Sequence, residues 1–182
     1  MVMDKIKKSN TYLIFGFPGI GKTYFTKNIA KNDLKYKYIR IADLDAGDYI
    51  WNKDKNGNKI YDKERPGWLD DYKKAIKEKI DSNYRIIFVS THFEVIDFLK
   101  DIENVEKIIV IPTINLKQHY LDLYKLRKSS EHLQEKINKN FEFMLFTIKD
   151  LYKKYHEQYS FKLIQFTKKE DNVETLLEKI FS

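Results

Sequence analysis

Five short stretches of this chain are almost entirely apolar, and they recur along its whole length. They contain aliphatic, β-branched and aromatic residues without the one-in-one-out alternation of a half-exposed strand, so they predict strands buried on both faces. The predicted strands span residues 11–15, 37–42, 84–90, 107–112 and 161–166.

Between these stretches the apolar residues recur at intervals of three and four, which is the period of a helix with one buried face. Thr91 and Glu94 form a T-x-x-E capping box that predicts the start of one such helix. Because strands alternate with helices, we predict an α/β fold in which helices cover both faces of a parallel sheet. The predicted helices span residues 22–31, 67–81, 92–101, 115–128, 130–156 and 171–181, and residues 46–66 form a polar segment.

Length and composition predict a single domain over residues 1–182, because a chain of this size buries enough apolar surface to need no disulfide or metal staple. The chain has no cysteine, which excludes disulfides and thiolate metal sites. The start, MVMDKIKKSN, lacks the apolar core of a signal peptide, and no apolar run approaches the roughly 20 residues of a membrane helix. We therefore expect a cytoplasmic protein without membrane contact, either a monomer or a homodimer.

The chain is basic, with 34 Lys and Arg against 27 Asp and Glu and a net charge of +7. Such a charge suits nucleic acid or a polyphosphate substrate. Because cations and acids are interspersed, and Lys, Asn, Ile and Tyr are abundant as in AT-rich genomes, compositional bias is the simpler interpretation. Arginine is scarce, so each arginine is a candidate for bidentate binding of an anion. The arginines are Arg40, Arg65, Arg85 and Arg127.

The first predicted strand runs into GFPGIGKTYF, residues 16–25. This stretch fits the phosphate-binding pattern G-x-x-x-x-G-K-[ST], and it lies between a predicted strand and a predicted helix as the pattern requires. Its backbone amides and the helix N-terminus would hold the phosphates of ATP, Lys22 would reach the β- and γ-phosphates, and Thr23 would bind Mg²⁺. The predicted ATP-binding residues are Gly16, Pro18, Gly19, Ile20, Gly21, Lys22, Thr23 and Tyr24.

Carboxylates follow the second predicted strand, at Asp43, Asp45 and Asp48. The apolar strands in RIIFVSTH and KIIVIPT end without the acid that motors and switches place there, and no N-K-x-D guanine signature is present. The four histidines show no metal-ligand spacing, so we predict no transition-metal site. Each of Asp43 and Asp45 could also simply cap a turn.

The P-loop, the D-x-D sequence after the second strand and the chain length resemble the P-loop kinases of nucleotides and small metabolites, such as nucleoside monophosphate kinases and shikimate kinase. DLDAGDYIW, RPGWLDDY, IIFVSTH and LYKLRKSSE together look more specifically like nucleotide kinases of bacteriophages that infect Gram-positive bacteria. The resemblance spans residues 11 to about 146. It implies a three-layer α/β/α P-loop NTPase fold, a five-stranded parallel sheet of order 2-3-1-4-5 and a mobile helical lid. It also implies that Asp43 contacts Mg²⁺ and that Asp45 orients or deprotonates the phosphoryl acceptor.

Aromatic residues and an arginine follow the acids, at Tyr49, Trp51, Arg65 and Trp68. Aromatic faces stack on a base and arginine grips a phosphate, which favours a nucleotide acceptor, although Trp68 could equally pack in the core. Ser90 and His92 close the third predicted strand, where ligands bind in α/β sheets, and His92 is a further candidate for the acceptor pocket.

The lid is predicted at about residues 115–140. An apolar stripe is followed on the same helix face by Arg127, and KSSE then breaks the helix, so Arg127 could swing onto the transferred phosphoryl group with Lys125 and Lys128 nearby. The alternative is that Arg127 stabilises a helix C-terminus.

The sequence therefore predicts an ATP- and Mg²⁺-dependent kinase in which Lys22, Asp43, Asp45 and Arg127 are catalytic and a small nucleotide or nucleoside is the acceptor. Two alternatives stay open. One is a polynucleotide 5′-hydroxyl kinase, which the positive charge also suits, and the other is a nucleotide-binding regulator without catalysis.

Overall fold

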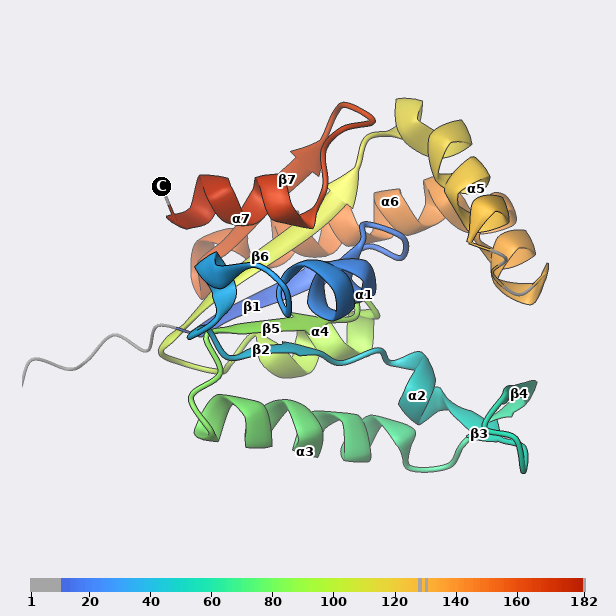
Figure 1. Cartoon of the computed structure of the whole chain (residues 1–182), viewed down its shortest axis with the longest axis horizontal. Coiled ribbons are helices and arrows are strands. Elements are labelled where there is room, and N and C mark those ends of the chain that lie inside the picture. Colours follow the sequence, from blue (N-terminus) through green and yellow to red (C-terminus); the bar gives the residue numbers. More distant parts are fainter. Residues whose placement is uncertain (1–10, 128, 130, 182) are drawn as a thin grey trace, which may run out of the picture.

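A computed structural model describes residues 11–127, 129 and 131–181, in which a five-stranded parallel sheet lies between helices (Figure 1). The strands lie in the order β2-β5-β1-β6-β7, which is 2-3-1-4-5 when only the strands of this sheet are counted along the chain. They are β1 (Thr11–Gly16), β2 (Ile41–Asp43), β5 (Ile86–Val89), β6 (Val105–Pro112) and β7 (Phe161–Phe166).

The centre of the sheet is fully buried, as its continuous apolar sequence predicts. Ile14 of β1 pairs in parallel register with Phe88 of β5 on one side and Ile108 of β6 on the other. Ile14 and Phe88 are completely inaccessible to solvent, and Ile108 is nearly so. Helices on both faces remove these strands from water, so neither face needs polar positions.

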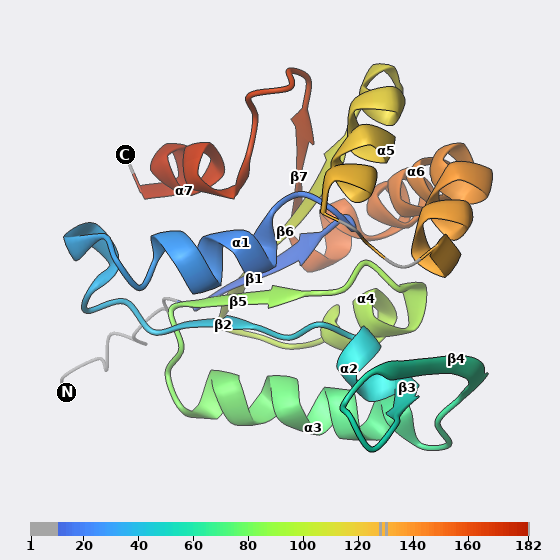
Figure 2. The same cartoon turned by 45° about the vertical axis from the view of Figure 1, so that its right-hand side comes forward.

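Helices cover the two faces of the sheet, with α1 and α7 on one side and α4 and α6 on the other (Figures 1 and 2). Helix α3 packs against α4 and β5, and α5 lies beyond the end of the sheet. The helices are α1 (Lys22–Tyr24), α2 (Gly47–Ile50), α3 (Trp68–Asp81), α4 (Phe93–Leu99), α5 (Lys117–Leu126), α6 (Glu131–Tyr159) and α7 (Val173–Phe181). None of the helices in the described part of the chain combines the length and the apolar character needed to span a bilayer.

The segment between β2 and α3, predicted only as polar, contains a β-hairpin. Strands β3 (Trp51–Lys53) and β4 (Lys59–Glu64) pair antiparallel as a separate two-stranded sheet. At the turn, one Asp54 carboxylate oxygen accepts hydrogen bonds from the backbone amides of Asn56 and Asn58, and Gly57 has φ +83°. This Asx-type turn with a left-handed glycine closes the hairpin.

Two local predictions are wrong, and one predicted helix takes an unexpected form. The second strand begins at Ile41 rather than at residue 37, because Leu34–Tyr36 form a 3₁₀ turn whose N-cap, Asp33, accepts from the Lys35 amide. The helix predicted over 22–31 continues from α1 as a π-helical turn over Phe25–Ile29. The capping box of Thr91 does not form, since His92 is the N-cap residue of α4 and makes no side-chain cap hydrogen bond.

Candidate functional site

The loop between β1 and α1 has the backbone shape that its glycines predict. Gly19 has φ +89° and Gly21 has φ +98°, and both values lie in the left-handed region that favours glycine. Gly21 is the N-cap residue of α1 and no side chain caps this helix start, and the first backbone amides of a helix have no partner within it. The loop therefore has the geometry of an anion-binding cradle.

Lys22 lies over this cradle. Its Nζ donates to the carbonyl oxygen of Gly16 at 2.7 Å, so the ammonium is held against the loop. Burial lowers the pKa of Lys22, an effect that the carboxylates of Asp43 and Asp45 partly oppose. The ammonium thus lies in a poorly solvated position, where its attraction for a phosphate is strong.

Thr23 and Asp43 meet beside the cradle. The hydroxyl of Thr23 donates to Oδ2 of Asp43 at 2.6 Å, while Oδ1 of Asp43 is buried with no hydrogen-bond partner among the described residues. Burial raises the pKa of Asp43, and the Thr23 hydroxyl and the Lys22 ammonium lower it in part. A hydroxyl and a carboxylate with a buried unpartnered oxygen are hard ligands that fit Mg²⁺.

Residues 11–127, 129 and 131–181 contain no group of three or more His, Cys, Asp or Glu side chains that could hold a metal ion by itself. Mg²⁺ beside a nucleotide needs no such group, because one or two protein oxygens, water and substrate phosphates complete its shell. Thr23 and Asp43 therefore fit a metal that arrives with a nucleotide.

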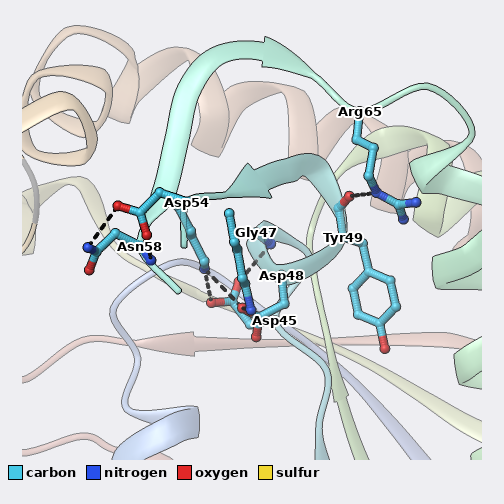
Figure 3. A network of polar contacts seen from close by, with 9 residues as sticks. Asp45, Gly47, Asp48, Tyr49, Asp54, Asn58 and Arg65 are labelled. Carbon is cyan, nitrogen blue, oxygen red and sulfur yellow. Dashed lines mark hydrogen bonds and ion pairs between the residues drawn. The ribbon is translucent and has the colours of Figure 1, made fainter. Parts of the chain in front are cut away.

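Asp45 is held in place by two donors at the base of the hairpin (Figure 3). Its Oδ1 accepts from the Gly47 amide at 2.9 Å, and its Oδ2 pairs with Nζ of Lys59 at 3.1 Å. Lys59 also lies 3.6 Å from Asp48. Burial raises the pKa of Asp45, but the Lys59 ammonium and the Gly47 amide lower it further, so the carboxyl has a net lowered pKa and is ionised at neutral pH.

Tyr72 of α3 fixes the segment that carries both acids. This side chain is completely buried, and its hydroxyl donates to the Leu44 carbonyl at 2.8 Å while it accepts from the Ser90 amide at 2.9 Å. Leu44 lies between Asp43 and Asp45. One hydroxyl thus joins the acidic segment to the end of β5.

His92 follows Ser90 at this end of β5. The Ser90 hydroxyl contacts Nδ1 of His92, and the Trp68 ring lies edge-on to the imidazole with 5.9 Å between ring centroids. Burial and then the Lys136 ammonium lower the pKa of His92. The imidazole is therefore neutral at physiological pH and can offer one donor and one acceptor.

The predicted lid contacts the loop through α5. Nη1 of Arg127 donates to the Gly19 carbonyl at 3.3 Å, and Tyr124, one turn earlier, packs its ring against Gly19. The Tyr124 hydroxyl is buried and has no hydrogen-bond partner among the described residues. Lys128 and Ser130 of the predicted hinge lie outside the described residues.

A cavity of about 350 Å³ joins the loop, the acids, the hairpin and the lid. Its charged lining consists of Lys22, Asp43, Asp45, Lys59, Glu64, Arg127 and Lys136. Of the other predicted site residues, the lining includes Gly16, Pro18, Gly19, Gly21, Thr23, Tyr24, Trp51 and His92. The elements far apart in sequence that form it, the hairpin and α5, lie beyond the same end of the sheet on either side of the loop (Figure 2).

Four predicted site residues do not line this cavity. Ile20 is buried beneath the loop, and Trp68 packs against His92 and Tyr72. The Tyr49 ring packs on Tyr72 with 5.0 Å between ring centroids. Arg65 donates to the Tyr49 carbonyl at 3.0 Å (Figure 3). It also pairs with Asp71 at 2.7 Å.

Sequence reasoning missed the part of the lining that comes from the hairpin and α6. Lys59, Tyr61 and Glu64 line the cavity from β4, and Lys136 lines it from α6. The hairpin had a readable signal, because an Asp and an Asn-Gly pair in NKDKNGNKIY have the chemistry of a tight turn. No sequence pattern predicted Lys136 in the cavity lining, since its position depends on how α6 crosses the sheet.

No known protein-family model matches this chain, and no curated protein is significantly similar to it.

Proposed function

We propose that the protein is an ATP- and Mg²⁺-dependent phosphotransferase that moves the γ-phosphoryl group of ATP to a small nucleotide or nucleoside. The observation that carries the proposal is the meeting of Thr23 and Asp43 at 2.6 Å beside the glycine loop, in one cavity with Asp45. The order of the five parallel strands supports a P-loop NTPase fold, since the glycine loop follows the central strand β1 and both acids follow β2, two places away from β1 in the sheet.

The donor side of the proposed reaction uses the loop and the lid. The loop amides and Lys22 would bind the β- and γ-phosphates, and Arg127, already at the Gly19 carbonyl, would reach the same phosphates. Thr23 and Asp43 would hold Mg²⁺, which when bound offsets the phosphate charge. The cations Lys22 and Arg127 on this side would stabilise the negative charge that develops as the phosphoryl group moves.

In the transfer step, an acceptor oxygen forms a bond to the γ-phosphorus while the bond between that phosphorus and the β–γ bridging oxygen breaks. ADP leaves with the electron pair of the broken bond. Asp45 would hold the acceptor in line with that bond, and a proton lost by the acceptor would pass to Asp45 or to water.

The proposal is tested with purified full-length chain, Mg²⁺ and γ-labelled ATP against a mixture of nucleosides and nucleoside monophosphates. Lys22→Ala should abolish both transfer and the rise in melting temperature that ATP causes, whereas Lys31→Ala, at an exposed lysine outside the cavity lining, should change neither. ATP that raises the melting temperature without any transfer of label would instead indicate a nucleotide-binding regulator.

A further inference from the structure

Helix α6 presents two phenylalanines to solvent, on the side opposite its buried stripe. The members of the buried stripe recur at the helical period and are each 5% exposed or less: Ile137, Phe141, Leu145, Ile148 and Tyr155. Phe143 and Phe146 fall on the other side of the helix and are 67% and 70% exposed. Helix α6 therefore packs in the core without these two large apolar side chains.

Charged side chains of both signs accompany the two phenylalanines on this outer face of α6. They share the helical spacing of the pair, and all are exposed: Glu135, Lys139, Glu142, Asp150, Lys153, Lys154 and Glu157. Acids match lysines along the face, although the whole chain has a net charge of +7. The outer face thus lacks the excess of positive charge that attracts an anionic membrane or a nucleic acid. Its mixed charge around an apolar centre fits a protein surface instead.

The order of charges on the outer face is complementary to itself under a two-fold axis. Lys139 and Asp150 lie equally far from the midpoint between Phe143 and Phe146, one on each side of it. When a second copy of α6 runs antiparallel across this midpoint, Lys139 of each copy meets Asp150 of the other. The phenylalanines of the two copies then meet at the centre. An isologous interface requires this kind of match, in which the same patch serves both subunits.

The ends of the outer face follow the same rule. Glu135 of one copy comes opposite Lys153 and Lys154 of the other when the helices run antiparallel. A parallel pair in register would instead place Lys139 against Lys139 and Asp150 against Asp150. Since like charges that face each other are destabilising, the charge order selects the antiparallel arrangement.

We propose that two copies of this chain associate through antiparallel contact of their α6 helices, with Phe143 and Phe146 at the centre and an ion pair between Lys139 and Asp150 on either side. The inference goes beyond the proposed phosphotransferase function and does not depend on it, because none of these side chains lines the cavity.

Sedimentation equilibrium of the purified full-length chain tests the proposal, and the parent should show a reversible equilibrium between monomer and dimer. Lys139→Glu and Asp150→Lys should each raise the dissociation constant of the dimer about tenfold or more, because each turns two exposed ion pairs of the dimer into two like-charge contacts. Lys31→Glu and Asp81→Lys make the same changes at exposed positions outside α6 and should leave the constant unaltered.

An equimolar mixture of Lys139→Glu and Asp150→Lys distinguishes the antiparallel pairing from any other dimer. In the mixed dimer, the glutamate introduced at position 139 meets the lysine introduced at position 150, and the native Asp150 of the first chain meets the native Lys139 of the second. Both ion pairs return, so the mixture should dimerise about as tightly as the parent. The two positions lie about three helical turns apart on one helix, so no contact within a single chain could produce this rescue.

The apolar centre is tested with a second pair of variants. Phe146→Ser removes an exposed ring of α6 and should weaken the dimer, whereas Tyr38→Ser, at a side chain that is 88% exposed, should not. Circular dichroism should be unchanged in every variant, because each altered side chain is exposed. A parent chain that stays monomeric up to its highest soluble concentration, or a mixture that dimerises no more tightly than either charge variant alone, would overturn the proposal.

Discussion

Replacing Tyr72 by Phe removes a single buried oxygen that joins the acidic segment to the end of β5. The ring stays, so the packing of this completely buried side chain is preserved. What is lost is the hydrogen bond to the Leu44 carbonyl at 2.8 Å and the one from the Ser90 amide at 2.9 Å. The substitution therefore isolates the energy of two hydrogen bonds.

The magnitude follows from the two backbone groups that lose their partner. An unsatisfied buried donor or acceptor costs about 1–3 kcal/mol, so we expect Tyr72→Phe, which leaves two such groups, to lower the free energy of unfolding by about 2–6 kcal/mol. In a chain of 182 residues, this corresponds to a fall in melting temperature of roughly 4–24 °C.

Tyr124→Phe is the matched control, because it removes the same atom from another buried tyrosine. The Tyr124 side chain is only 4% exposed, and its hydroxyl has no hydrogen-bond partner among the described residues. Removing an unsatisfied hydroxyl costs nothing and relieves a desolvation penalty, so the free energy of unfolding should stay the same or rise by about 1 kcal/mol.

Both variants are measured by urea unfolding of the ligand-free protein, followed by circular dichroism, with the slope m checked for equality to the parent. A loss for Tyr72→Phe below about 1 kcal/mol, or an equal loss for the two variants, would refute the reasoning that Tyr72 holds the acidic segment through hydrogen bonds.

Two further predictions concern pH and the glycine loop. Burial, followed by the Lys136 ammonium, lowers the pKa of His92 below its ordinary 6.5, so the folded protein binds fewer protons than the unfolded chain between the two pKa values. The melting temperature should therefore fall as pH is lowered through 6.5, and His92→Gln should flatten this part of the pH profile; an unchanged profile would contradict the assignment. Gly19→Ala should destabilise the protein and weaken ATP binding, because its φ is +89° and the added carbon would lie 2.7 Å from the Tyr124 hydroxyl. Gly57→Ala is the control, because Gly57 has φ +83° but no atom lies within 4 Å of the added carbon, so this variant should lose stability only through backbone strain. Equal ATP affinity of the two variants, measured by calorimetry, would contradict a clash between the carbon added at position 19 and Tyr124.

The sheet could be predicted because its signal is local and strong. Strands such as β5 are buried on both faces and read as continuous apolar runs, and the glycine loop is specified by residues that are adjacent in sequence. The acids at 43 and 45 could be placed at the correct end of the sheet for the same reason, since they directly follow a strand.

Neither the hairpin nor the contacts of Arg65 could be predicted from local sequence in this way. The residues of β4 are mostly exposed, so they carry no apolar period, and only turn chemistry marks the hairpin. Arg65 was expected to face an acceptor phosphate, but the chain path brings Asp71 and the Tyr49 carbonyl within its reach. Competition between a ligand and a neighbouring carboxylate is decided by tertiary distances, which residue type alone does not contain.

The two ends of the hairpin segment are fastened to each other. The Arg65 amide donates to the Ile50 carbonyl at 2.7 Å, and neither β3 nor β4 pairs with a strand of the main sheet. The segment between these two residues can therefore change in length and in side chains, by evolution or by engineering, without altering the register of the main sheet or the shape of the glycine loop. Under the proposed function, acceptor preference and nucleotide binding would then be set by separate parts of one small chain.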